Sequence, residues 1–445
     1  MDEQNTAYST LWGQDGSVRS MPSLLVAYHP NPLHIGTVIP LVEPLELGRG
    51  SNVLGKGFLD DKRLSRKHAV VVGKGDEVSC VDLGSTNGTF IDGVRISEAI
   101  LSNGSMLRVG NLMLVRRDLE EHFLPPKSPR FVGIGPGIAR VLRSISAVAP
   151  ERMAVLVRGE TGVGKELVAQ ELHAASGRRG RLVPVNCAGI ADGVLHTELF
   201  GHKRGAFTGA GEAKDGLVLQ AENGTLFLDE IGDATPAFQK SLLRFLQEGT
   251  VRAVGGKTER AIDVRVVAAT HVDLDRAVAE GTFRADLLAR LDRWSISVPP
   301  LRDRVEDLPS LSRSIVGPDA ILPVGLVERL MTHPWPGNIR ELHSLLRWYE
   351  LRCKAGEGTE AEVEERLEAA LRRTAPEAPD PGAPSAERPN RSELITIFHA
   401  ERGRMTAVAR SFGVSRATIY RWFETANLDP SQLRAPDGGD DDSTG

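Results

Sequence analysis

The sequence lacks the features that mark secreted, membrane-spanning or cysteine-stapled proteins. Only three of its 445 residues are cysteines, and they lie far apart with no Cys-x-x-Cys pair, which argues against a disulfide framework or a zinc site. No apolar run approaches the ~18 residues of a membrane-spanning helix. The first residues, MDEQNTAYSTLWGQDGS, contain neither the basic nor the apolar segment of a secretory leader. We therefore expect a cytoplasmic protein with no membrane partner.

Strong net charge is also absent. The formal net charge is −5, with 25% charged and 41% hydrophobic residues, which is ordinary for a globular protein. Nucleic-acid binding would therefore require a local basic patch. At about 150 residues per domain, the length predicts two to four domains.

Shifts in composition divide the chain. Short apolar runs between Gly, Asn, Asp and Ser predict an all-β sandwich, and alternating strands and helices then predict an α/β domain with a parallel sheet. Thr359 and Glu362 fit a helix capping box. The predicted segments are a polar tail (1–22), the β-sandwich (23–118), a linker (119–130), the α/β subdomain (131–300), a helical lid (301–353), a charged helix with a Pro-rich linker (354–389), a small all-α domain (390–430) and an acidic tail (431–445).

A glycine-rich loop follows the first strand of the α/β segment and opens a helix. The sequence GETGVGKE fits G-x-x-x-x-G-K in the context that this phosphate-binding motif requires. Backbone N–H groups would surround the phosphates, and Lys165 is placed for the β- and γ-phosphates of ATP. A tight strand–helix turn is the alternative. The candidate residues are Gly159, Glu160, Thr161, Gly162, Val163, Gly164, Lys165 and Glu166.

The segment TLFLDE, residues 225–230, predicts a buried strand that ends in two acids. Asp229 is the candidate Mg²⁺ ligand, and Glu230 is the candidate residue that polarises the attacking water. Asn186 ends another predicted strand, and its amide is expected to hold the Glu230 carboxylate. A strand ending in solvated acids is the weaker alternative.

Three arginines are candidates for contacting the γ-phosphate. Arg284 and Arg290 lie near the end of a predicted helix, far from the glycine loop in sequence, so we expect them to act in a neighbouring subunit. Their spacing alone favours ordinary surface salt bridges. Arg340, early in a predicted lid helix, is the candidate γ-phosphate sensor of the lid.

The motifs resemble, in order, the AAA+ ATPase domain of bacterial enhancer-binding proteins, which activate sigma-54 RNA polymerase. GETGVGKE, ELFGHKRGAFTGA, GTLFLDEIGD, LLRFLQEG, FRADLLARL and WPGNIREL all occur between residues 131 and 352. The resemblance implies ATP hydrolysis with Mg²⁺ in a ring, commonly a hexamer, and Glu166 matches the family. It places Thr270 and His271 at the γ-phosphate sensor. His271 stands where the family has Asn, so turnover or its coupling to loop movement is in doubt.

In this family GAFTGA is the tip of a mobile loop that contacts sigma-54. Glycines would let the loop move, Phe207 would offer an apolar contact and Thr208 a hydroxyl group. An apolar side chain on such a hinge is costly unless a partner covers it. A hairpin turn tucked against its own domain is the alternative. The six residues are Gly205, Ala206, Phe207, Thr208, Gly209 and Ala210.

The β-sandwich resembles the forkhead-associated (FHA) domain, which binds phosphothreonine peptides. The landmarks are GRGSNVLGKG, LSRKHA and DLGSTNGTFIDG. The resemblance implies that Arg49 and Ser65 bind the phosphate, that Arg66 and Thr86 assist, and that Asn87 holds the peptide backbone. His68 is interpreted as a structural brace for the Ser65 loop. A sandwich whose polar loops only make turns is the alternative.

Residues 390–428 resemble a Fis-type helix-turn-helix, with Gly413 and Val414 in the turn. This segment has six arginines against three glutamates, which provides a local basic patch. A helical dimerisation hairpin is the alternative. The candidate DNA-binding residues are Ser415, which would cap the recognition helix, and Arg416, Thr418, Tyr420 and Arg421.

Two functions follow from this organisation. The first is a sigma-54-dependent activator that binds enhancer DNA, remodels the closed complex with ATP and is controlled by a phosphothreonine protein or a serine/threonine kinase. The second is a DNA-binding regulator whose ATPase domain is only a nucleotide-gated assembly switch, because His271 impairs turnover.

Overall fold

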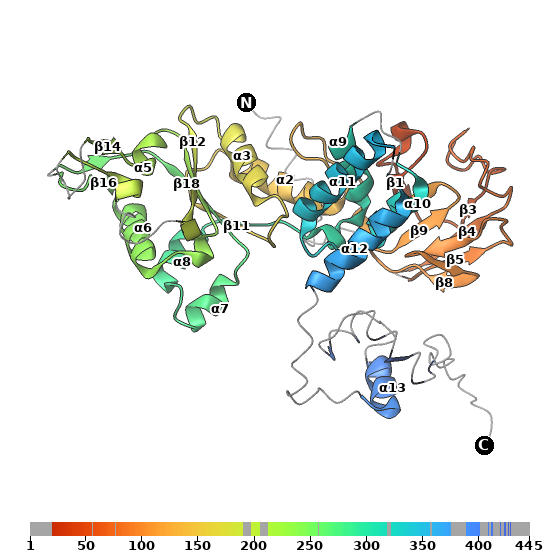
Figure 1. The fold of residues 1–445 in the computed structure, drawn as a ribbon. Coiled ribbons are helices and arrows are strands. Elements are labelled where there is room, and N and C mark those ends of the chain that lie inside the picture. Colours follow the sequence, from red (N-terminus) through yellow and green to blue (C-terminus); the bar gives the residue numbers. More distant parts are fainter. Residues whose placement is uncertain are drawn as a thin grey trace, which may run out of the picture. The chain divides into compact units, whose positions relative to one another are not determined.

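The computed structural model describes residues 20–374 except 56, 76, 190–196, 205–211, 257, 318–321 and 357, then 389–400 and residues 408, 411, 412, 419, 422, 423, 426 and 428. The chain forms two compact units, Met1–Leu371 and Arg372–Gly445. The first contains an antiparallel β-sandwich, a parallel α/β subdomain and a helical lid (Figure 1). None of the helices in the described ranges is long and apolar enough to cross a membrane.

Two antiparallel sheets form the sandwich, in the orders β2-β1-β10-β9-β6-β7 and β3-β4-β5-β8. Their inward side chains, among them Leu24, Leu47, Val71 and Leu114, make one apolar core. The elements are β1 (Ser20–Tyr28), η1 (Pro32–His34), β2 (Val38–Pro40), β3 (Leu45–Leu47), β4 (Ala69–Lys74), β5 (Glu77–Asp82), β6 (Thr89–Ile91), β7 (Val94–Ile96), β8 (Glu98–Ile100), β9 (Met106–Val109) and β10 (Leu112–Glu120).

The six-stranded sheet is buried on both faces. Successive side chains of a strand point to opposite faces, and on β10 Leu112 and Leu114 enter the sandwich core, whereas Met113 and Val115 join a second core shared with the lid. This explains why β10 is apolar without interruption from Leu112 to Val115. An antiparallel strand with one solvated face would alternate instead.

The α/β subdomain is built on a parallel sheet in the order β12-β15-β18-β11-β19. One apolar core lies under α2 and α3, and another lies under α6 and α8, so helices cover both faces. Its elements are α2 (Pro136–Val148), β11 (Val155–Arg158), α3 (Lys165–Ala175), β12 (Leu182–Asn186), η2 (Cys187–Gly189), β13 (Gly201–His202), β14 (Lys214–Asp215), α5 (Leu217–Gln220), β15 (Thr225–Asp229), η3 (Ile231–Asp233), α6 (Pro236–Glu248), β16 (Thr250–Val251), β17 (Arg260–Ala261), β18 (Arg265–Thr270), α7 (Leu274–Ala279), α8 (Ala285–Leu291) and β19 (Ser295–Ser297).

The lid packs its helices around the fully buried Trp335, whose indole N–H donates to the carbonyl of Leu330 at 2.8 Å. The predicted capping box is formed, since the Glu362 N–H donates to the Thr359 hydroxyl and the Thr359 N–H donates to the Glu362 carboxylate. The lid elements are η4 (Leu301–Asp303), η5 (Val305–Asp307), α9 (Leu308–Val316), α10 (Val324–Thr332), α11 (Asn338–Lys354) and α12 (Glu360–Thr374).

The second unit contains α13 (Arg391–Ala400). Just before this helix, the Asn390 backbone N–H donates to the Glu393 carboxylate, and the Glu393 backbone N–H donates to Asn390 Oδ1. Leu394 and Phe398 of this helix pack in an apolar cluster with Val408, Ile419, Phe423 and Leu428. The predicted all-β sandwich and the α/β subdomain with its helical lid are both confirmed. All three cysteines are free thiols, as their spacing predicted.

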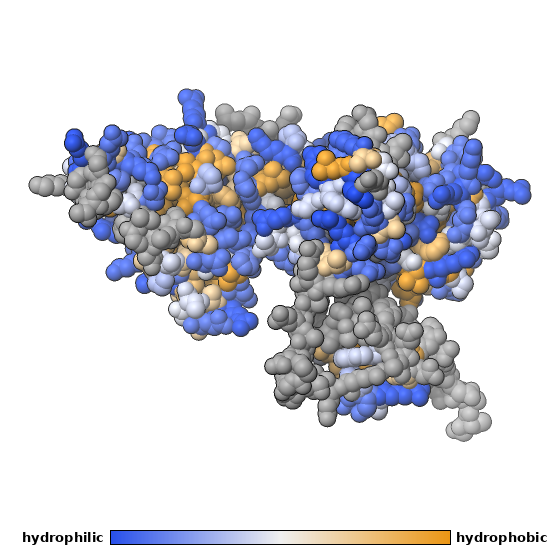
Figure 2. All heavy atoms as spheres, in the orientation of Figure 1, coloured by the Kyte–Doolittle hydropathy of each residue, from blue (hydrophilic) through white to orange (hydrophobic). Residues whose placement is uncertain are grey.

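Space-filling Figure 2 shows hydrophilic residues over most of one face. Hydrophobic residues gather mainly in the region where Figure 1 places α3, β12 and β18 of the α/β subdomain.

Candidate ATP and phosphothreonine sites

The glycine-rich loop lies between β11 and α3. Gly162 and Gly164 have φ values of +81° and +105°, which side chains with a Cβ rarely adopt, so the turn requires glycine at both positions. Lys165 is the first residue of α3 and only 6% of its side chain is exposed. Its Nζ donates to the Gly159 carbonyl at 3.0 Å and pairs with Glu230 at 3.3 Å. The loop thus combines open N–H groups at a helix start with a held ammonium group, as a phosphate site requires.

The carboxyl ends of the parallel strands bring the predicted acids to this loop. Asp229 ends β15, and Thr270 ends the neighbouring β18. The Gly159 N–H donates to the Thr270 carbonyl at 3.2 Å, and the Thr270 hydroxyl accepts the Val272 N–H at 2.9 Å. Glycine loop, acids and sensor strand therefore meet at one edge of the sheet, where ligands of open α/β sheets bind.

Glu230 is the most constrained residue at this edge. Its φ of +50° is left-handed, a strained conformation for a residue other than glycine. The ring nitrogen Nδ1 of His271 lies 2.7 Å from Glu230 Oε2, and the backbone N–H of His271 donates to the same oxygen at 3.3 Å. Burial raises the pKa of Glu230, but the hydrogen bond from His271 and the charge of Lys165 outweigh burial and hold the pKa below its ordinary value. Glu230 is therefore an ionised carboxylate held on two sides.

Asp229 has the opposite electrostatic setting. Burial and the neighbouring charge of Glu230 raise the pKa of Asp229, and the charge of Lys165 offsets them only in part. A carboxylate in this setting gains from a bound cation, and carboxylate oxygens are ligands that Mg²⁺ prefers. The residues present therefore fit the predicted magnesium ion.

The predicted contact between Asn186 and Glu230 is a point of correction. The Asn186 side-chain oxygen accepts the Ala188 N–H at 3.0 Å, and the Glu230 carboxylate is held by His271 and Lys165 instead. Asn186 pairs in register with Asp229, so it lies at the correct edge. The side chain of Asn186 is instead bonded to the Ala188 N–H, just beyond β12.

Lid residues also form hydrogen bonds with the glycine loop. Arg302 donates to both Glu160 oxygens, at 2.5 and 2.9 Å, and Asn338 Nδ2 donates to Glu160 at 3.0 Å. The bond from Arg302 lowers the pKa of Glu160, although burial opposes it. A Cβ added to Gly162 would lie 3.2 Å from the Arg340 Cβ. The Arg340 Cβ is therefore packed against the glycine loop. The sequence did not predict the roles of Arg302 and Asn338. Arg302 lies 142 residues from Glu160 in the chain, and such a distant pair leaves no local pattern.

The two arginines predicted to act on a neighbouring subunit lie on or beside α8. Arg284 precedes this helix and pairs with Asp286 at 2.7 Å, and Arg290 is in its last turn. Both side chains are exposed. This placement leaves both available to another subunit.

The predicted sigma-54 contact, Gly205–Ala210, lies outside the described residues. The flanking strands β13 and β14 pair antiparallel, with Gly201 opposite Asp215. Two backbone hydrogen bonds connect this hairpin to Val254. The Lys203 N–H donates to the Val254 carbonyl at 3.0 Å, and the Val254 N–H donates to the Gly201 carbonyl at 2.9 Å. The strands on either side of the segment are therefore paired with each other and bonded to the rest of the subdomain.

The five predicted phosphothreonine-binding residues lie on three loops of the sandwich that interlock. The Ser65 hydroxyl contacts the Thr86 hydroxyl at 3.3 Å and accepts the Thr86 N–H at 3.0 Å. The Arg49 N–H donates to the Ser65 carbonyl at 2.9 Å, and Asn87 Nδ2 donates to the Arg63 carbonyl at 2.7 Å. Arg49, Arg66, Thr86 and Asn87 are exposed. These bonds bring together the three loops that carry the five residues.

Two buried or half-buried groups hold these loops in shape. His68 is fully buried, its Nδ1 accepts the Ser65 N–H at 3.1 Å and its Nε2 lies 3.1 Å from the Gly88 carbonyl, which is the bracing that the sequence predicted. Asp82, which was missed, accepts the hydroxyl groups of Ser85 and Thr89 at 2.5 and 2.6 Å. Burial raises the pKa of Asp82, but these bonds outweigh it and lower the pKa overall.

The predicted DNA-binding residues, Ser415, Arg416, Thr418, Tyr420 and Arg421, lie outside the described part of the chain.

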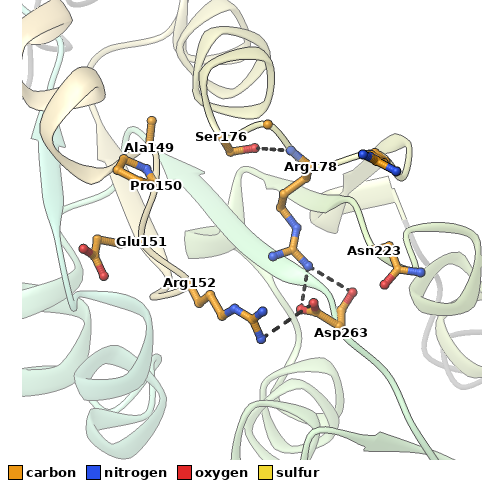
Figure 3. Close-up of a pocket in the computed structure, with 10 residues that line it drawn as sticks. Ala149, Pro150, Glu151, Arg152, Ser176, Arg178, Asn223 and Asp263 are labelled. Atoms are coloured by element: carbon orange, nitrogen blue, oxygen red, sulfur yellow. Dashed lines mark hydrogen bonds and ion pairs between the residues drawn. The ribbon is translucent and has the colours of Figure 1, made fainter. Parts of the chain in front are cut away.

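A polar pocket of about 470 Å³ lies away from the glycine loop (Figure 3). Arg178 crosses it to Asp263 at 2.6 Å, and Arg152 approaches Asp263 at 3.9 Å. Its residues precede β11, β12, β15 and β18, so it lies at the amino edge of the sheet, opposite the candidate ATP site. The internal pairing of its charges makes it a structural junction.

Comparison with known proteins identifies two domains in the chain. Residues 131–297 match the sigma-54 interaction domain, and residues 46–110 match the FHA domain. The α/β subdomain with its glycine loop, acids and lid is an AAA+ ATPase module, joined here to an FHA domain.

The transcriptional regulatory protein ZraR of Klebsiella oxytoca is 39% identical over 298 residues, which are 65% of this chain and 67% of ZraR. The chain belongs to the family of transcriptional regulators that carry a sigma-54 interaction domain. The DNA-binding transcriptional regulator NtrC of Bradyrhizobium sp. (strain RP501 Parasponia) is 47% identical over 224 residues, so the match spans only 47% of NtrC. A crystal structure of NtrX from Brucella abortus in complex with ATP has 29% sequence identity and a TM-score of 0.48, covering 68% of this chain and 70% of that chain.

The contact between His271 and Glu230 gives a pH prediction. It helps to hold the pKa of Glu230 below its ordinary value, so His271→Ala should raise that pKa. In the role of water-activating carboxylate Glu230 must be ionised, and the acid limb of the kcat–pH profile should therefore move to higher pH. His271→Asn retains a side-chain N–H donor and should move the limb less. Identical acid limbs in all three proteins would contradict this role for His271.

Proposed function

We propose that this protein is a sigma-54-dependent transcription activator that couples ATP hydrolysis to remodelling of the closed promoter complex. The convergence of Lys165, Asp229 and Glu230 at one sheet edge carries the proposal, because it supplies a phosphate site and a hydrolytic carboxylate. The adjacent hairpin β13–β14 presents an intact GAFTGA sequence. We take the domain boundaries predicted from the sequence as those of the functional domains.

ATP is bound by the glycine loop and Lys165, with Arg340, Thr270 and His271 around the γ-phosphate. Asp229 would hold Mg²⁺, which neutralises phosphate charge when bound. Glu230 polarises the attacking water. Exposed Arg284 and Arg290 complete the site of a neighbouring subunit in a ring, which we take to be a hexamer.

The regulatory input is a phosphothreonine protein, which points to control by a serine/threonine kinase. Arg49 and Ser65 bind the phosphate, Arg66 and Thr86 assist, and Asn87 holds the peptide backbone. A charge-assisted contact from arginine is the strongest of these interactions. The C-terminal unit binds enhancer DNA through its local basic patch.

One observation favours a second function, a nucleotide-gated assembly switch. His271 engages the Glu230 carboxylate at 2.7 Å and could keep it from the attacking water. Steady-state ATPase activity separates the two functions. We expect Glu230→Gln to lose roughly 10²- to 10⁴-fold in kcat while retaining ATP binding. A wild-type rate no higher than that of Glu230→Gln would establish the switch.

For the FHA domain, we expect Arg49→Ala to weaken phosphothreonine-peptide binding by about 10- to 100-fold, the loss that a charged hydrogen bond of about 1.5–3 kcal/mol implies. Basal ATPase activity should not change. Lys74→Ala, at the far end of β4, is the matched control and should bind normally. Unchanged peptide affinity in Arg49→Ala would refute the assignment.

For the sigma-54 contact, we expect wild-type protein trapped with ADP and aluminium fluoride to retain purified sigma-54 on a native gel. Thr208→Ala should lose this retention while keeping nucleotide binding, because it removes only the hydroxyl and methyl groups of one loop side chain. If both proteins bind nucleotide and neither retains sigma-54, remodelling is refuted and the switch becomes the better account.

A further inference from the structure

The FHA domain and the lid share an apolar core. Ala27 of β1, Met106 of β9, and Met113 and Val115 of β10 pack in one cluster with lid residues from η4, η5 and the lid helices, and each of these four is at most 1% exposed. Strand β1 contacts α9 and η5 directly, and Figure 1 draws β1 and β9 beside α9 and α10. The outer face of the six-stranded sheet is therefore an interior surface, and separating the two parts would expose it to water.

Two ion pairs flank this core. Arg117 of β10 donates to the Glu306 carboxylate at 2.5 Å and to the Asp303 carbonyl at 2.8 Å, and the Glu306 side chain is only 1% exposed. Arg108 of β9 pairs with Glu328 of α10 at 2.7 Å, with 15% and 18% of the two side chains exposed. Breaking a buried pair leaves an uncompensated charge, so both pairs favour the docked arrangement.

The lid segment that receives Arg117 also holds the ATP site. Arg302 binds Glu160 of the glycine loop. Arg304, which is 2% exposed, donates to the Val163 carbonyl of the same loop at 3.0 Å. Asp307 accepts the N–H groups of residues 134 and 135, ahead of α2. Six consecutive residues of the lid, 302–307, therefore contact the FHA domain, the glycine loop and the start of the ATPase subdomain.

A second route joins the phosphothreonine loops to the lid. The loop that carries Thr86 and Asn87 runs directly into β6, where Phe90 lies. The Arg108 guanidinium carbon lies 3.8 Å from the centroid of the Phe90 ring, a cation–π contact, and the same guanidinium group binds Glu328. Consecutive contacts therefore connect this loop, through Phe90 and Arg108, to Glu328 of α10.

We propose that the FHA domain and the lid move as one body, and that a phosphothreonine ligand on the FHA domain tightens ATP binding through the Arg108–Glu328 and Arg117–Glu306 contacts. The proposal rests on the phosphothreonine function proposed above. Ordering the FHA loops, β6 and the lid on the first binding event lowers the entropy cost of the second. Coupling between two binding events is reciprocal, so ATP must tighten phosphopeptide binding by the same factor.

The test uses the full-length protein with ATPγS and a degenerate phosphothreonine peptide pool, with the unphosphorylated pool as control. Calorimetry gives the Kd for ATPγS, and fluorescence anisotropy gives peptide binding. We expect the phosphorylated pool to lower the Kd for ATPγS by about fivefold or more, at the lower end of typical allosteric couplings. Arg108→Glu should lose this effect while both ligands still bind separately, and Arg108→Glu/Glu328→Arg should restore it.

Arg276→Glu makes the same charge change in the exposed pair with Glu280 and should couple as the wild type does. Full coupling in Arg108→Glu, or a Kd for ATPγS unchanged within about twofold when the peptide is bound, would overturn the proposal. Absence of peptide binding to the wild type would overturn the phosphothreonine function itself, and the coupling with it. The charge-swap variant keeps the test decisive even if Arg108→Glu does not fold.

Discussion

The structure depends on the buried charge cluster of lid residues Arg304, Glu306 and Asp307. Burial and the charge of Glu306 raise the pKa of Asp307 to about 7, and the charge of Arg304 offsets them only in part. Burying such charges is costly unless each is paired. The partners come from outside the lid: the glycine-loop carbonyl, the backbone ahead of α2, and Arg117 of the FHA domain. The cost of burial is offset only when all three parts of the first unit are assembled.

The ATP site follows from this assembly. Parallel strands deliver Asp229 and Glu230 to one edge, and the lid positions the loop above them through Arg302 and Asn338. His68 and Asp82 make the hydrogen bonds that connect the FHA loops to one another. The two sets of contacts lie in different parts of the first unit, and the shared core between the sandwich and the lid joins these parts.

Local sequence patterns were sufficient for the folds and for much of the sites, because the glycine loop, the strand ending in Asp229 and the FHA landmarks each require specific residues at short spacing. Contacts between distant segments could not be predicted in this way. The apolar run of β10 indicates burial on both faces but not which element covers the second face. Glu160 shows no sign in the sequence of its partner Arg302. His271 was noted as a departure from the family, but its contact with Glu230 depends on the register of β15 and β18.

On this interpretation the FHA domain and the lid form one rigid body above the ATP site. Electron–electron double resonance on spin-labelled full-length protein tests it most directly, with exposed Cys353 replaced by serine and labels introduced by Glu77→Cys in the FHA domain and His343→Cys in the lid or Ala289→Cys on α8. The account requires a single narrow Glu77–His343 distance that is unchanged by ATPγS, whatever the Glu77–Ala289 distance does. A Glu77–His343 distribution that is broad, or that shifts with nucleotide, would contradict it.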